Sequence, residues 1–257
     1  MGERTSHAPG TFSWTDLSTS DPPGAKTFYG ELFGWEAEDM PGAAGTYTMF
    51  RLDGKDVAAC FGQDDGPPPH WNSYVTVEDV DSSASRTATL GGTVMMEPGD
   101  VEGVGRMGVI ADPAGAPLAL WEPRGHIGAG VVNVPGALCW NDLGTTDVDS
   151  ATAFYGELFV WSYEQRMDDD PLRYTRIRNG DSENGSIHLQ GDDERGTPPS
   201  WIVYFAAADL DSTNSKLTEL GGRVIVEPLE VPAGGRVSVA TDPQGAAFGL
   251  FDGPLDP

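Results

Sequence analysis

The chain of 257 residues repeats its own sequence, and this repeat limits the possible folds more than any other feature. The segment 28–35 reads FYGELFGW and returns at 154–161 as FYGELFVW. The pattern Asp-Pro-x-Gly-Ala occurs at 112–116 and again at 242–246, so the matches run in the same order through both halves. Such repetition predicts two copies of one domain. We expect these domains at residues 1–125 and 135–257, joined by a Gly-rich linker at 126–134.

Each half is expected to contain two smaller units of one kind. A strand at 11–19 precedes Asp21, which suits a helix N-cap, and the helix that follows ends near Gly34. Three strands are expected after this helix, and two of them can be located, at 45–52 and 57–62. The order of strand, helix and three strands occurs four times along the chain. Helices that interrupt runs of antiparallel-capable strands predict an α+β fold with curled sheets.

Composition excludes several classes of partner. Forty Asp and Glu residues face 15 Lys and Arg residues, which gives a net charge of −25. Nucleic acids and anionic membranes are bound by basic patches, so we expect neither as a partner. The chain has no secretory signal at its start and no apolar run of membrane-spanning length, which predicts a cytoplasmic protein. Cys60 and Cys139 form no disulfide framework and are expected to be buried, reduced thiols.

These patterns resemble the vicinal oxygen chelate superfamily, which includes glyoxalase I, the extradiol dioxygenases and the bleomycin-resistance proteins. The resemblance rests on the strand–Asp–helix segment with its Phe-Tyr pair and on the later Asp-Pro-x-Gly. It covers nearly the whole chain twice and is nearest to tandem glyoxalase-like proteins of actinobacteria. It implies that each half forms an open eight-stranded cup from two βαβββ units, with a small molecule inside.

The resemblance also implies a divalent metal in each cup, held by His, Gln or Glu at set strand positions. In this chain the positions hold other residue types. Indole, isoleucine, alanine and glycine offer no suitable donor atom, and a lone amide is a poor ligand. We therefore expect no metal, and no flavin or nicotinamide cofactor either, because no Gly-rich nucleotide fingerprint follows a strand. The positions are Trp14, Asn72 and Ala119 in the first half and Trp140, Ile202 and Gly249 in the second.

Strand alternation predicts which side chains line each cup, if the ligand positions point inward. Each cup then has a Trp, a Tyr, an aromatic ring from its last strand and one Asp, while Ala119 and Gly249 leave room. We expect the first cup to be the stronger site, because Ile202 removes a polar contact from the second. The predicted ligand-binding residues are Trp14, Asp16, Asn72, Tyr74 and Trp121 in the first cup, and Trp140, Asp142, His188, Tyr204 and Phe251 in the second.

The same residues also have structural interpretations. The two tryptophans can plug the cups as hydrophobic core. The two cup carboxylates can be satisfied by ion pairs, since an unpaired buried carboxylate is costly. His188 can be a strand histidine with a purely structural partner. The arginines available for the ion pairs are Arg106 and Arg236, and the acidic run 168–170 reads as a solvated loop.

Three functions compete. The first is a metal-free protein that binds an aromatic, optionally cationic, small molecule through Trp and Tyr rings, for self-resistance or to assist a tailoring oxygenase. The second is a cofactor-independent hydroxylase of natural-product biosynthesis, with Asp16, Asp142 and His188 as acid–base candidates. The third is a metal-dependent glyoxalase or dioxygenase, which only the family resemblance favours.

Overall fold

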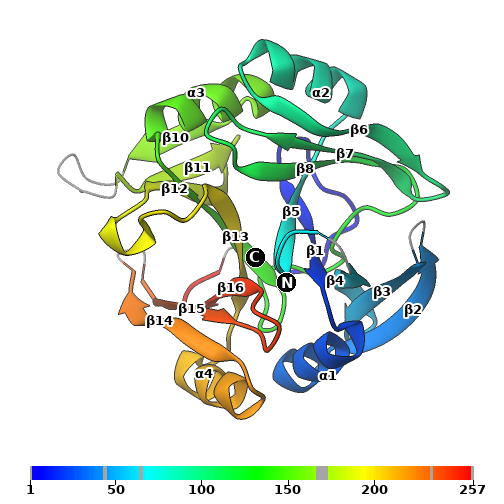
Figure 1. Cartoon of the computed structure of the whole chain (residues 1–257), viewed down its shortest axis with the longest axis vertical. Helices are drawn as coiled ribbons and strands as arrows, with labels where there is room; N and C mark the ends of the chain where they lie inside the picture. Colours follow the sequence, from blue (N-terminus) through cyan, green and yellow to red (C-terminus); the bar gives the residue numbers. More distant parts are fainter. Residues whose placement is uncertain (1, 43–44, 64–65, 166–172, 232–233, 256–257) are drawn as a thin grey trace.

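Two eight-stranded sheets, one in each half, form the scaffold of the protein (Figure 1). The computed structural model describes residues 2–42, 45–63, 66–165, 173–231 and 234–255. The strand order is β2-β3-β4-β1-β5-β8-β7-β6 in the first sheet and β10-β11-β12-β9-β13-β16-β15-β14 in the second, so the two sheets share one topology. Each sheet consists of two βαβββ units that meet where the opening strands pair antiparallel. The fold is therefore α+β, with two tandem open cups.

The elements of the two halves correspond one to one. The first half contains β1 (Phe12–Thr19), α1 (Pro22–Phe33), β2 (Glu36–Gly42), β3 (Gly45–Leu52), β4 (Lys55–Gly62), β5 (His70–Thr76), α2 (Val80–Thr89), β6 (Thr93–Val101), β7 (Gly105–Ala111) and β8 (Pro117–Pro123). The second half contains β9 (Leu138–Thr145), α3 (Val148–Phe159), β10 (Ser162–Gln165), β11 (Thr175–Asn179), β12 (Ser182–Leu189), the 3-10 turn η1 (Asp192–Glu194), β13 (Ser200–Ala206), α4 (Leu210–Glu219), β14 (Arg223–Glu230), β15 (Arg236–Thr241) and β16 (Ala247–Asp252).

The ends of the first helix follow from its sequence. Asp21 caps α1 as predicted, since its side chain accepts a hydrogen bond from the backbone N–H of Gly24 at 3.0 Å. Gly34 ends the helix in the left-handed conformation, with φ of 77°. Val160 takes the same conformation after α3, with φ of 61°, and this backbone is strained for a β-branched residue.

The strand that the sequence did not locate is β2. All seven of its residues are exposed, and it pairs only with β3 at the edge of the sheet. A strand without a buried face shows no alternation of apolar and polar residues, so periodicity does not reveal it. The acidic run 168–170 lies outside the described residues.

The helices cover the convex side of the assembly and bring the two halves together. Figure 1 shows α1 beside α4 and α2 beside α3. One buried cluster joins α1 and β4 of the first half to α4 and β16 of the second, and another joins β5 and β8 to α3. Because both cores draw residues from both halves, separating the halves would expose apolar surface to water.

The two repeated motifs meet across the contact between the halves. The hydroxyl of Tyr29 donates a hydrogen bond to Oδ2 of Asp242 at 3.1 Å and accepts one from Nε1 of Trp71 at 3.0 Å. Tyr155 lies beside Asp112 in the mirrored arrangement. Burial, and then the charge of the neighbouring carboxyl, raises the pKa of both phenols. Each FYGELF tyrosine therefore reaches the Asp-Pro-x-Gly turn of the other half.

The tryptophans that follow the same motif repeat this exchange. Nε1 of Trp35 donates to the carbonyl oxygen of Gly136 at 2.7 Å, and Nε1 of Trp161 donates to that of Gly10 at 2.7 Å. Each indole thus holds the chain just before the opening strand of the other half. The repeated segment therefore forms contacts between the two domains.

Two expectations about the rest of the chain can be compared with the structure. Cys60 is buried as predicted, whereas Cys139 is partly exposed, where β9 and β13 shift register between Tyr204 and Phe205. Neither cysteine forms a disulfide. Within the described ranges, no helix is long and apolar enough to cross a bilayer.

We predict that Tyr29→Phe destabilises the whole protein by about 2–3 kcal/mol, because it leaves the Trp71 N–H and the Asp242 carboxyl buried without their partner. Tyr155→Phe should cost less, because Nε1 of Trp201 donates to its hydroxyl at 3.0 Å but Oδ2 of Asp112 has no hydrogen-bond partner to lose. Equilibrium denaturant unfolding measures both. A loss below about 0.5 kcal/mol in either variant, the size of an ordinary surface substitution, would show that these contacts do not hold the halves together.

Candidate functional site

The first cup is the sheet face that carries Trp14, Asp16, Asn72, Tyr74 and Trp121. The structure brings all five residues together. The three aromatic rings belong to one apolar cluster and are only 5–7% exposed. This cup is packed as a hydrophobic core, which is the structural interpretation that the sequence left open for Trp14.

Asp16 lies at the centre of the first cup and is satisfied by uncharged donors. Its Oδ1 accepts a hydrogen bond from Asn72 at 2.9 Å, and its Oδ2 accepts from Tyr74 at 2.8 Å and Tyr47 at 2.9 Å. Burial raises the pKa of Asp16, and these hydrogen bonds offset part of the rise. The ion pair with Arg106 is wrong, because that guanidinium pairs with surface carboxylates of α2 and β6 instead.

The segment after β8 closes the first cup. The ring of His126 packs edge-on against Trp14, with ring centres 4.7 Å apart. Farther along, the fully buried Ala129 donates its N–H to the carbonyl oxygen of Ser13 at 2.7 Å. Gly128 permits this approach, because its φ is 102° and a Cβ there would lie 2.4 Å from the same oxygen. The linker thus fills the cup that the sequence favoured as the stronger site.

The second cup is the face that carries Trp140, Asp142, His188, Tyr204 and Phe251. In contrast with their counterparts in the first cup, the residues Trp140, Tyr204 and Phe251 are each partly exposed. Trp140 and Tyr204 are direct neighbours across β9 and β13. The aromatic residues of the second cup are therefore more accessible to solvent than those of the first.

A chain of polar contacts crosses the floor of the second cup. The hydroxyl of Ser186 accepts a hydrogen bond from Nε1 of Trp140 at 2.7 Å and donates one to Oδ1 of Asp142 at 2.5 Å. Oδ2 of Asp142 lies 2.9 Å from Nδ1 of His188, and both carboxylate oxygens of Glu194 lie 3.2 Å from Nε2. The second cup thus satisfies its carboxylate with a histidine instead of tyrosines.

The charges around His188 set its protonation. Burial alone would lower the pKa of the imidazole, but the charge and hydrogen bond of Asp142, followed by those of Glu194, raise it to about 9. His188 is therefore protonated at neutral pH and can donate hydrogen bonds from both ring nitrogens. The alternative ion pair of Asp142 with Arg236 is wrong, because Arg236 pairs with Asp211 and Asp252.

Strand register shows why the two cups differ. Asp16 and Asp142 are opposite Ala59 and Ser186 on the neighbouring strand. On the next strand of each sheet, Met49 of β3 is opposite Ala59, whereas Arg176 of β11 is opposite Ser186. Arg176 pairs with carboxylates of β10 and β12. At these positions the last two strands of the first unit, β3 and β4, carry apolar residues, whereas β11 and β12 carry polar ones.

Sequence reasoning missed several functional contacts. It did not assign Ser186, Arg176, Glu194 or Tyr47 to a cup. Aligning β4 with β12 through the internal repeat would have placed Ser186 beside Asp142, since β12 keeps the same register against β9. Nothing in the sequence would have identified Glu194, because it comes from the turn η1, which is found only in the second half among the described residues.

The residues at the metal positions of the fold do not fit a divalent metal. Nε1 of Trp14 already donates to Tyr47, and the Asn72 amide donates to Asp16. The expected space above Gly249 is also filled, because a Cβ there would lie 2.1 Å from the ring of Tyr204. Apolar, indole and amide groups in these places supply no set of oxygen, nitrogen or sulfur ligands.

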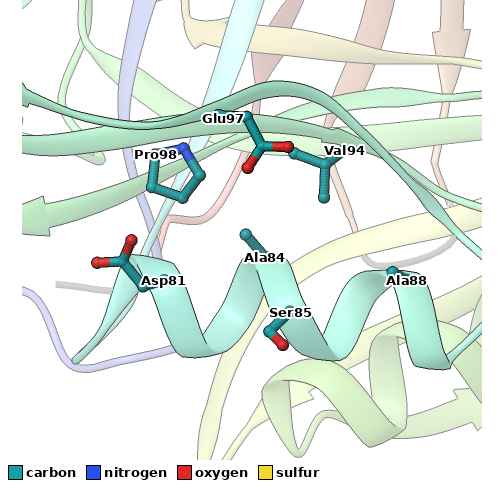
Figure 2. A pocket seen from close by; sticks show the side chains of 7 residues that line it. All are labelled: Asp81, Ala84, Ser85, Ala88, Val94, Glu97 and Pro98. Atoms are coloured by element: carbon teal, nitrogen blue, oxygen red, sulfur yellow. The ribbon is translucent and has the colours of Figure 1, made fainter.

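A cavity of about 320 Å³ lies outside both cups, between α2 and β6 (Figure 2). Ala84 lines it, whereas the equivalent place beneath α4 holds the larger Asn214, which bonds Ser238 at 3.1 Å. The carboxylates at its rim are exposed, and one of them, Asp81, is already paired with Arg106.

We predict that the His188 cluster makes stability fall at alkaline pH. The pKa of about 9 in the folded protein lies above the ordinary histidine pKa of 6.5, so the stabilisation is complete below pH 6.5 and is lost as the pH rises through about 9. The loss should be roughly 2–3 kcal/mol after discounting for the partly exposed Glu194. Denaturant unfolding at pH 6.5 and 9.5, compared with His188→Gln, isolates this contribution from that of the cysteines. An equal pH dependence in both proteins would contradict it.

Comparisons with known proteins agree with this architecture. The model of the Glyoxalase/Bleomycin resistance protein/Dioxygenase superfamily matches residues 11–120 and 137–250. CFP32 of Mycobacterium tuberculosis, named as a candidate glyoxylase, is 41% identical, over 98% of each chain. The anthracycline biosynthesis protein DnrV of Streptomyces peucetius is 37% identical, over 96% of this chain and 95% of its own.

Solved structures show the same fold at low sequence identity. The Mn(II)-bound glyoxalase of Novosphingobium aromaticivorans superposes with a TM-score of 0.68 at 15% identity, over 98% of this chain and 83% of its own. The 2,3-dioxygenase LapB of Pseudomonas sp. KL28 gives 0.66 at 13% identity, over 98% and 95%. With two matched segments and full-length relatives above 30% identity, the chain belongs to the glyoxalase/bleomycin resistance protein/dioxygenase superfamily.

Proposed function

We propose that this protein binds a planar aromatic small molecule of natural-product biosynthesis without a metal, and that the second cup holds the ligand. The observation that carries the proposal is the contrast between the cups. Trp140, Tyr204 and Phe251 are partly exposed around a hydrogen-bonded Asp142–His188 pair, while the first cup is closed. Flat apolar surfaces with a few placed polar groups are the usual composition of a small-molecule pocket.

The relatives support an aromatic ligand. DnrV is named for anthracycline biosynthesis, and an anthracycline contains a flat fused-ring chromophore. Such a ring can stack on Trp140, which contributes about 0.5–1.5 kcal/mol beyond the burial of apolar area. The net charge of −25 favours neutral or cationic ligands over anionic ones at long range. Binding without reaction suits sequestration for self-resistance, or delivery of an intermediate to a tailoring oxygenase.

A cofactor-independent reaction on the bound aromatic molecule is the second candidate. The observation that favours it is the orientation of His188 by Asp142, an arrangement suited to proton transfer. Because His188 is protonated at neutral pH, it would act as a proton donor to the ligand and not as a base. Chromatography of a hydroxyanthraquinone incubated with the protein distinguishes the two candidates, since a binding protein returns the compound unchanged.

We predict that the purified protein carries no stoichiometric transition metal in either cup. Trp14, Asn72 and Ala119 in the first half, and their counterparts in the second, lack the donor set that zinc, nickel, iron or manganese requires. Elemental analysis after growth in metal-supplemented medium checks this. One equivalent of such a metal, lost on substitution of Asp142 or His188, would overturn the metal-free proposal.

We predict that substitution of Trp140 weakens ligand binding, whereas substitution of Trp14 lowers the stability of the fold. Trp140→Ala should weaken binding of alizarin, a planar hydroxyanthraquinone, by about 30- to 150-fold, because stacking and apolar burial are lost. Trp14→Ala should instead cost about 3–5 kcal/mol of stability, as for a buried large side chain. The milder Trp14→Phe provides a folded control that should keep the affinity of the native protein.

Affinity is measured from the change in alizarin absorbance as protein is added. Stability is measured by denaturant unfolding. If Trp14→Phe weakens alizarin binding strongly while Trp140→Ala leaves it intact, the ligand occupies the first cup, and the assignment to the second is wrong. If alizarin binds neither the native protein nor any variant, the proposed ligand class is wrong.

A further inference from the structure

His188 has two carboxylate partners, Asp142 at Nδ1 and Glu194 at Nε2. Glu194 is the more exposed of the two and lies outside the sheet. Asp142 lies on the central strand β9, is 9% exposed and is also held by Ser186. Glu194 comes from the three-residue turn η1, and its side chain is 37% exposed. Its two oxygens share Nε2 at 3.2 Å, whereas Asp142 makes a single contact of 2.9 Å with Nδ1.

The contacts that hold Glu194 in place are local to its own turn. The backbone N–H of Glu194 donates to the carbonyl oxygen of Gly191 at 3.2 Å. The Glu194 side chain accepts a hydrogen bond from the backbone N–H of Gly191 at 2.9 Å. Neither contact belongs to the sheet. The turn can therefore move its carboxylate away from His188 without breaking a strand pair, whereas Asp142 cannot leave without disrupting the floor of the cup.

Gly144 of the central strand β9 leaves the space that the Glu194 carboxylate occupies. A Cβ at Gly144 would lie 3.3 Å from both Oε1 of Glu194 and Cε1 of His188. The first half has Ser18 at this place on β1 and Phe61 opposite it, where the second half has His188. Only the second cup of the described structure thus combines a small strand residue with a protonated hydrogen-bond donor at this position.

From this geometry we infer that Glu194 occupies the place of a ligand oxygen, and that an aromatic molecule with a hydroxyl or ketone oxygen binds by displacing Glu194 from Nε2 of His188. The inference rests on the function proposed above and adds the polar group that the ligand must carry. The ring stacks on Trp140 while its oxygen accepts the hydrogen bond that Glu194 releases. Arg176, opposite Ser186, is already paired with Glu164 and Glu183, so His188 is the cation that the ligand oxygen would meet.

The class of ligand follows from the charges. His188 has two donors and no acceptor when protonated, and Asp142 uses one of them. The free partner must therefore be an acceptor, such as a phenolate, a phenol oxygen or a quinone carbonyl. An aromatic amine without such an oxygen gains nothing from the release of Nε2, and it loses the attraction of the Glu194 charge.

The test compares Glu194→Ala with Asp192→Ala, a matched change in the same turn. Asp192 pairs with Arg195, and among the described residues it forms no hydrogen bond or ion pair with His188. Two probes are titrated into the intact protein: alizarin, which carries acceptor oxygens, and 9-aminoacridine, a planar cation without them. His188→Gln provides a third variant, and circular dichroism shows which variants are folded.

The inference predicts that Glu194→Ala binds alizarin about tenfold more tightly than the native protein, since no internal carboxylate competes for His188. Asp192→Ala should leave the affinity unchanged, and neither variant should bind 9-aminoacridine more tightly. His188→Gln should weaken alizarin binding at least tenfold, because the donor to the ligand oxygen is lost. If His188→Gln does not fold, the comparison of Glu194→Ala with Asp192→Ala tests the inference on its own.

The inference is overturned if Glu194→Ala leaves alizarin affinity unchanged or lowers it while Trp140→Ala still abolishes binding. Glu194 would then be a fixed structural partner, and the function proposed for the cup would stand. If alizarin binds neither the native protein nor Glu194→Ala, both the function and the inference are wrong. Equal tightening for alizarin and 9-aminoacridine would show that the turn only restricts access, which also overturns the role of the ligand oxygen.

Discussion

The reciprocal contact between each FYGELF tyrosine and the Asp-Pro-x-Gly turn of the other half is the interaction on which the rest of the structure depends. Tyr29 links Trp71 of its own half to Asp242 of the other, whereas Tyr155 accepts from Trp201 and lies beside Asp112. Tyr29, Trp71 and Asp242 are buried, so each depends on its hydrogen-bond partner. The contact brings the helical faces together and turns the two cups away from the shared cores.

Duplication explains why the two cups have diverged. In a duplicated chain the two copies can take different roles. In the first half the cup is part of a core, because the linker packs His126 and Ala129 over Trp14. In the second half the same positions stay partly exposed. Both copies retain the central carboxylate, but its partners are neutral hydroxyls in one and a protonated histidine in the other.

Much of this fold follows from the sequence, because its repeats and helix caps are local patterns. The 28–35 motif, the Asp21 cap and the order of strands predicted the architecture, and alternation brought Trp14, Asp16, Asn72 and Tyr74 to one face. The edge strand β2 was not located from the sequence, because no face of it is buried. The closure of the first cup and the role of Glu194 also escaped, since both depend on where a loop settles in three dimensions and not on the spacing of residues along a strand.

The two ways of satisfying a buried carboxylate have different consequences for function. Asp16 is held by Tyr47, Asn72 and Tyr74, all on strands of one sheet, so none of these partners can leave without deforming the sheet. Asp142 orients a cation, and that cation passes its remaining hydrogen bond to a group on a short turn. A hydrogen bond to a charged donor is strong, and here its acceptor lies on a three-residue turn outside the sheet. The first network belongs to a core, whereas the second would leave a strong donor for a ligand oxygen if Glu194 is displaced as proposed.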